Sequence, residues 1–150
     1  MAKGQSLADS HKVSRACGRG YDEDKHVVTS AAFAPSTQEI RLHLLHRRSV
    51  DWVQCAYVSE ADQDIHGSLK RLRVQRLKRD QYVAVLGVAD IRSVKAESLN
   101  LDVVEAGNQT WECHCAIVET SSKPIDPLLQ DELAKLANAH GTVVHLELRL

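Results

Sequence analysis

The C-terminal part of the chain changes from a helical repeat to a strand repeat across a single glycine, Gly141. Before that glycine, leucines recur at the spacing of one helix face, and they are Leu128, Leu129, Leu133 and Leu136. Asp126 is suited to the N-cap of this helix, Pro127 to its first turn and Gly141 to the position after its end. Residues 142–150 then alternate between apolar and polar side chains, as a half-buried strand does. A fold that contains both elements needs a helix layer and a sheet.

Strand patterns recur through the rest of the chain. β-branched, alternating or continuous apolar residues predict strands at 26–34, 40–44, 81–91, 98–106 and 111–119. The stretch 50–58 favours a short helix, because its apolar residues recur at a helical spacing. A strongly basic helix is predicted at 68–80, with Leu69 among its contacts to the core.

These patterns predict one α+β domain. Its sheet is expected to be mixed or mainly antiparallel, with about five or six strands and two or three helices packed on it. No repeat, low-complexity tract or Pro- and Ser-rich linker divides the chain. Residues 1–10 are small and polar and predict a loose N-terminal arm, so the domain is expected to span 11–150.

Composition excludes several classes of protein. No stretch approaches the roughly 18 consecutive apolar residues that cross a bilayer, and the N-terminus lacks the apolar core of a secretory signal. The net charge is -1, which gives no overall attraction to nucleic acid or to anionic membranes. A cytoplasmic protein without a membrane partner is therefore expected. Its cysteines are expected to be reduced thiols rather than a disulfide framework.

The stretch WECHCAIVET, at 111–120, places two thiols and an imidazole side by side. On a strand, Cys113 and Cys115 point to one face and His114 to the other, so the three do not converge on one metal ion. The closely spaced pairs of ligands that structural zinc uses are absent. No cofactor is therefore favoured, and Cys113, Cys115 and Cys17 become candidate ligands only if the protein is found to contain zinc. Packing of small thiols beside apolar neighbours is the simpler interpretation.

The most biased local composition is the basic stretch at 69–79, whose cations are Lys70, Arg71, Arg73, Arg76, Lys78 and Arg79. On a helix, several of these side chains would line one side, where they could contact the phosphates of RNA or DNA. The alternative is a solvated helix face, or a docking surface for an acidic partner. No aromatic residue lies within the stretch to stack on a base, which weakens the nucleic-acid interpretation.

Short motifs along the chain resemble those of a group of small bacterial proteins without an assigned function. The pattern runs His-x-Val-Ser-Arg-x-Cys, then Ser-Ala-Ala-Phe, then Ser-His-x-x-Ile. It matches this chain at His11, Arg15, Cys17, Ala31, Ala32, Phe33, His114 and Ile117. The chain departs from the pattern at Cys113, where the group has Ser, and Cys115 has no counterpart. The resemblance implies no activity.

Three functions remain open. The leading hypothesis is a non-catalytic interaction module that acts with a protein partner, because no Gly-x-Ser-x-Gly elbow, Walker A loop or His-Glu-x-x-His helix is present. The second is a small hydrolase-like enzyme, or a metal or thiol site, whose catalytic residues are His11, Arg15, Cys17 and His114. It predicts that these four meet in one pocket, with Cys17 within roughly 10 Å of His114. The third is nucleic-acid binding through the basic helix at 69–79.

Overall fold

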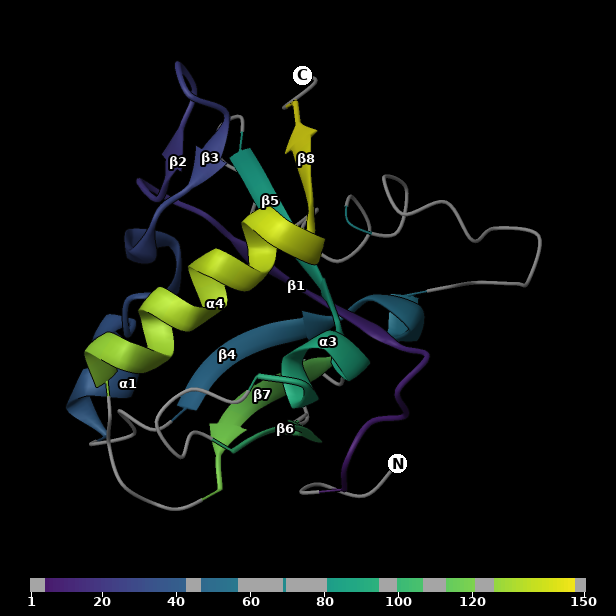
Figure 1. Cartoon of the computed structure of the whole chain (residues 1–150). Helices are drawn as coiled ribbons and strands as arrows, with labels where there is room; N and C mark the ends of the chain where they lie inside the picture. Colours follow the sequence, from purple (N-terminus) through teal and green to yellow (C-terminus); the bar gives the residue numbers. More distant parts are fainter. Residues whose placement is uncertain are drawn as a thin grey trace.

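The structure is a computed structural model, and it describes residues 5–42, 47–56, 69, 81–94, 100–106, 113–120 and 126–147. They form a six-stranded sheet with helices over one of its faces (Figure 1). In spatial order the strands are β6 (Leu101–Glu105), β7 (His114–Glu119), β4 (Arg47–Trp52), β1 (Lys12–Ala16), β5 (Gln81–Gly87) and β8 (Thr142–Leu146). Every neighbouring pair is antiparallel. The predicted α+β class, with a mainly antiparallel sheet, is confirmed.

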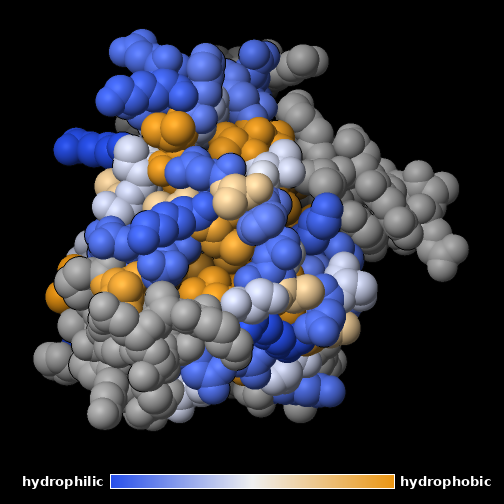
Figure 2. Space-filling model, in the orientation of Figure 1, coloured by the Kyte–Doolittle hydropathy of each residue, from blue (hydrophilic) through white to orange (hydrophobic). Residues whose placement is uncertain are grey.

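The remaining elements are short, apart from one helix. They are the hairpin of β2 (Tyr21–Asp22) and β3 (Val27–Val28), the 3-10 helices η1 (Ser30–Phe33) and η2 (Val53–Ala56), and the helices α1 (Thr37–Arg41), α3 (Val88–Arg92) and α4 (Asp126–His140). Leu129 and Leu133 of α4 are buried against the sheet, as their spacing predicts. Gly141 ends the helix by donating its N–H to Leu136 O and Ala137 O. Figure 2 shows the surface in the orientation of Figure 1, and hydrophobic residues are visible there between hydrophilic ones.

The sheet has two differently covered faces. Val13, Val50 and Leu86 belong to the larger core cluster, on the face that α4 covers. The opposite face, called the second face below, has a smaller core cluster made of Val53, Leu69, Val83, Val85, Cys113 and Leu146. Within the described residues, no helix is both long and apolar enough to cross a membrane.

The N-terminal residues that the structure describes are not a loose arm. Ser6 pairs with Val104 of β6, and the N–H of Leu7 donates to Val103 O (2.9 Å). Leu7 is buried in the larger core cluster, and Arg92 of α3 donates a hydrogen bond to its carbonyl. The small polar residues around Leu7 concealed this single apolar anchor, which covers the outer edge of β6.

Three predicted strands differ from the structure. The strand predicted at 81–91 ends at Gly87, and Val88–Arg92 is the helix α3. The second half of 26–34 is the 3-10 helix η1, and only Val27–Val28 is a strand. The alternation predicted at 40–44 falls on the end of α1, where Ile40 and Leu42 are 55% and 51% exposed. The cause is a capping box: Ser36 Oγ accepts a hydrogen bond from Glu39 N (3.1 Å), and Glu39 Oε1 accepts one from Ser36 N (2.8 Å). This local cap favours a helix where the side-chain pattern predicts a strand.

The expected helix at 50–58 is also wrong in its first part. β4 continues through Trp52, and a 3-10 turn, η2, follows. The basic helix predicted at 68–80 lies outside the described residues except for Leu69, which is helical and fully buried in the smaller core cluster.

Candidate functional site

The residues predicted as a catalytic group point to both faces of the sheet. Arg15 and Cys17 point to the face under α4, where Cys17 belongs to the larger core cluster. His114 lies opposite Asp51, and Asp51 opposite Ser14, in a row that points to the second face. Strand spacings of about 4.8 Å and rises of about 3.3 Å per residue put the Cα atoms of Cys17 and His114 roughly 14 Å apart. The structure does not bring all four residues into one pocket, although Arg15 and His114 both line one hollow of the sheet.

Arg15 connects the sheet to the segment that contains η1 and α1. Its guanidinium donates from Nε to Ala32 O (3.0 Å), from Nη2 to Ala34 O (2.7 Å) and from Nη1 to Ser49 O (2.8 Å). Burial lowers the pKa of Arg15, while the carboxylate of Glu39, 3.7 Å from Nη2, acts in the opposite direction. These contacts give Arg15 a structural role, since its nitrogens hold backbone carbonyls of three segments.

Cys17, a predicted catalytic residue, and Cys115, a conditional zinc ligand, are both buried thiols. Burial raises the pKa of Cys17 to about 11, and burial together with nearby carboxylates raises the pKa of Cys115 to about 12. Because the thiolate is the reactive form, neither residue is suited to nucleophilic catalysis near neutral pH. His11 packs against Trp52, with ring centroids 5.2 Å apart.

The expectation that all the cysteines are reduced thiols is wrong, because Cys55 and Cys113 form a disulfide. Trp52 N donates to Cys113 O (2.8 Å), so the end of β4 lies beside the residue that precedes β7. Cys55 follows in η2 and comes within a Cα–Cα distance of 5.6 Å of Cys113. The bridge removes Cys113 from the conditional zinc ligands. The described residues contain no group of three or more His, Cys, Asp or Glu that could hold a metal ion.

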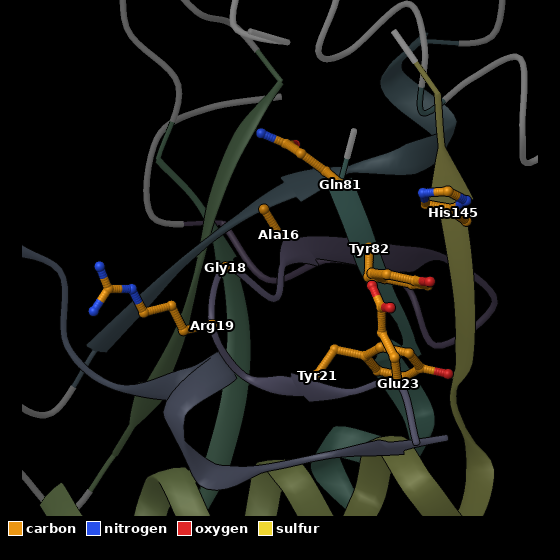
Figure 3. Close-up of a pocket in the computed structure, with 8 residues that line it drawn as sticks. All are labelled: Ala16, Gly18, Arg19, Tyr21, Glu23, Gln81, Tyr82 and His145. Atoms are coloured by element: carbon orange, nitrogen blue, oxygen red, sulfur yellow. The ribbon is translucent and has the colours of Figure 1, made fainter. Parts of the chain in front are cut away.

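One end of the sheet has an open hollow of about 510 Å³, called the aromatic pocket (Figure 3). Its lining residues are Ala16, Gly18, Arg19, Tyr21, Glu23, Gln81, Tyr82 and His145. Tyr82 stacks on Tyr21 at 4.2 Å and on His145 at 4.5 Å between ring centroids, so three rings form a ladder. Arg19 lies on the other side of the hollow from this ladder (Figure 3).

The turn after β1 builds this pocket. Gly18 has φ +56, a backbone conformation that glycine adopts without strain, and the N–H of Gly20 donates to Cys17 O (2.8 Å). The chain reverses here and brings Tyr21 over Tyr82. Partial burial raises the pKa of Tyr82, and the charge and hydrogen bond of Glu23 raise it further. The phenol therefore stays protonated and donates to the carboxylate.

A second hollow, of about 290 Å³, lies on the second face and is called the serine pocket. Its polar lining residues are Ser14, Arg15, Ser36, Ser49, Asp51 and His114. Ser14 is 1% exposed and Asp51 4%. The Oγ of Ser14 has no hydrogen-bond partner within the described part of the chain.

The outer edge of β8 is a third candidate, because no described residue pairs with it. Cys17 N donates to Tyr82 O (2.9 Å), so the backbone groups of Tyr82 face β1, and those of its neighbour Val83 face β8. The same alternation on β8 directs the N–H and C=O groups of Val143 and His145 away from the sheet. The edge therefore presents a row of backbone donors and acceptors.

No family model, curated protein or solved structure matches this chain. The similarity to a group of small bacterial proteins stays a prediction. The described geometry is accordingly the basis for the function proposed below.

Sequence reasoning found His114 but missed the residues around it. Ser14 and Asp51 are separated by the β2–β3 hairpin, η1 and α1, and they meet only through strand register, which no local pattern encodes. Register likewise pairs Tyr82 with His145, whereas the turn after β1 brings Tyr21 to this stack. The cations predicted for nucleic-acid binding, Lys70, Arg71, Arg73, Arg76, Lys78 and Arg79, lie outside the described residues.

Proposed function

We propose that the protein is a non-catalytic interaction module that binds an extended segment of a partner protein as an added strand beside β8. The observation that carries this proposal is the outward direction of the backbone groups of Val143 and His145, at an edge that no described residue covers. In this mode of recognition, main-chain hydrogen bonds supply affinity, and alternate side chains supply specificity.

The unequal treatment of the two sheet edges supports the proposal. Proteins protect exposed edges with Lys, Pro, bulges or a covering segment. Residues 5–7 cover the edge of β6, whereas β8 has the sequence TVVHL, without Lys, Pro or an acidic residue. An edge strand without these protective features is suited to pairing with a strand of another chain.

Two substitutions at one position test the proposal. His145→Pro removes an outward N–H, and proline is tolerated on an edge strand when its missing N–H faces solvent. His145→Ala removes the same imidazole and keeps the N–H, so it is the matched control. Proteins retained by immobilised wild type and by the alanine variant, but lost with the proline variant, are identified and purified. With each purified partner we expect at least tenfold weaker binding to His145→Pro and a change below threefold for His145→Ala.

Amide hydrogen exchange gives the second readout. The N–H groups of Val143 and His145 should exchange rapidly in the isolated protein and become protected in the complex, because they would then donate to the added strand. Equal binding of a folded His145→Pro variant, or protection confined to another surface, contradicts strand addition at β8.

Nucleic-acid binding is a second candidate, favoured by the aromatic pocket. Arg19 lines this pocket with the stacked rings, and Gln81 of its lining follows the basic stretch 69–79 in the sequence after Asp80 alone. Single-stranded nucleic acid binds where cations and rings that can stack on bases occur together. Fluorescence anisotropy with a labelled oligouridine should show binding that weakens with salt and with Tyr21→Ala. Binding that is absent at low salt, or unaffected by both changes, excludes this function.

The cytoplasmic location expected from the sequence stays a prediction. The Cys55–Cys113 bridge is a contrary indication, since disulfides persist mainly in oxidising compartments. Alkylation of thiols in intact host cells before lysis distinguishes the two: modified Cys55 and Cys113 support the cytoplasm, and an intact bridge supports an oxidising compartment.

A further inference from the structure

Three polar residues from separate segments form a row on the second face of the sheet. Ser14 of β1 lies directly opposite Asp51 of β4, and Asp51 lies directly opposite His114 of β7. Residues paired in this way project from the same face with neighbouring side chains in contact range. The strand spacing of about 4.8 Å places Ser14 and His114 on either side of the carboxylate, each about one strand away.

Ser14 and Asp51 of this row are buried, and His114 is half-buried. Ser14 is 1% exposed, and its hydroxyl has no hydrogen-bond partner among the residues that the structure describes. Such a group loses its hydration on folding without full compensation, which is unfavourable. Ser14 lines the serine pocket, so a bound group in that pocket could restore the missing hydrogen bond.

Two charged side chains, Asp51 and Arg15, line the pocket. The guanidinium of Arg15 donates to the carbonyls of Ala32, Ala34 and Ser49, and the carboxylate of Glu39, 3.7 Å from Nη2, offsets its charge. Asp51 is therefore the group that supplies negative charge to a ligand in the pocket. The hydroxyl of Ser14, the carboxylate of Asp51 and a neutral imidazole can all accept hydrogen bonds, and a carboxylate accepts about four in total. The carboxylate of Asp51 can therefore accept hydrogen bonds from a ligand and keep its contacts within the protein.

We infer that the serine pocket binds a primary ammonium group, held by Asp51 with Ser14 and His114 on either side. An ammonium group has three donors, which matches three acceptor groups, and its charge complements the carboxylate. A quaternary ammonium has the same charge but no donor, so it would leave Ser14 without a partner. This site is independent of strand addition at β8.

The ammonium group could belong to a free small amine or to a lysine side chain of a partner. Heteronuclear NMR titration of the full chain compares butylammonium, tetramethylammonium and a Gly-Gly-Lys-Gly-Gly peptide that is N-acetylated and C-amidated, so that the lysine side chain carries its only ammonium group. We expect butylammonium or the lysine peptide to shift the amide signals of Ser14, Asp51 and His114, with at least tenfold weaker effects of tetramethylammonium. Tighter binding of the peptide identifies a lysine side chain as the natural source, and tighter binding of butylammonium identifies a free amine.

Two variants locate the binding. Asp51→Asn should weaken it at least tenfold, and Ser14→Ala about threefold to tenfold, because each removes one acceptor. Asp90→Asn, on α3, makes the same change of charge away from the pocket and should bind as the wild type does. Ser14→Ala removes a hydroxyl that has no partner among the described residues, so we expect it to keep the fold even if Asp51→Asn does not. Absence of saturable shifts, equal effects of tetramethylammonium, or unchanged binding to Ser14→Ala overturns the inference.

Discussion

Gly20 is the residue whose replacement the structure penalises most directly. A Cβ atom at this position would lie 2.0 Å from Ala32 N and 2.3 Å from Ala32 Cα, which are backbone atoms. We therefore expect Gly20→Ala to lower the free energy of unfolding by about 3 kcal/mol or more, since neither segment can move without disturbing the turn or η1. Urea denaturation followed by circular dichroism measures the change.

Gly18→Ala is the control for this prediction. Gly18 has φ +56 and no atom within 4 Å of its ideal Cβ position, so alanine there encounters only backbone strain, about 1–2 kcal/mol. If Gly18→Ala proved more destabilising than Gly20→Ala, the close packing of this turn on η1 would be incorrect.

The buried thiols predict an unusual pH dependence. The pKa of Cys17 is raised from 9.0 to about 11, so at pH 8 its thiolate fraction is about 100-fold lower in the folded than in the unfolded protein. Alkylation of Cys17 by iodoacetamide, followed by mass spectrometry, should be slower in the native protein than in urea by at least that factor. Since the folded state binds this proton more tightly, the thiol stabilises the fold below pH 9, and the contribution is lost as the pH rises through 11. Equal rates in the two states would contradict this burial.

The disulfide joins η2 to the residue that precedes β7. It closes a loop with a sequence separation of 58, for which chain entropy predicts about 4 kcal/mol of stabilisation. Reduction with dithiothreitol should lower the wild-type urea midpoint to that of the double variant Cys55→Ala and Cys113→Ala. The double variant itself should not respond to dithiothreitol. Four reactive thiols in the unfolded, unreduced wild type, instead of two, would show that the bridge does not form.

The elements that the sequence predicts well are those with local signals. Repeating leucines, an N-terminal Asp-Pro and Gly141 together define α4, and strict alternation defines β8. At α1 two local signals conflict: the alternation around Ile40 predicts a strand, whereas the capping box of Ser36 and Glu39 favours the helix that the structure contains. The candidate sites are different, because Ser14, Asp51 and His114 become neighbours only through the register of three strands.

For the molecule as a whole, the N-terminal residues decide which edges of the sheet are accessible. Deletion of residues 1–7 would expose β6 and remove Leu7 from the core, a loss of about 2–5 kcal/mol for a buried leucine. We expect the shortened chain to associate as its concentration rises, in size-exclusion chromatography with light scattering. Deletion of residues 1–4 keeps the pairing of Ser6 with Val104, so we expect the same elution volume and molar mass as for the full chain. A monomeric chain after the longer deletion would contradict a protective role for this segment.

Residues 5–7 pair along the edge of β6, and no described residue pairs with β8, so β8 is the edge through which two such sheets would join. If β8 pairs with β8 of a second molecule, the combined sheet ends on each side at a β6 edge that residues 5–7 cover. Association through β8 then closes as a dimer and does not continue as an open filament.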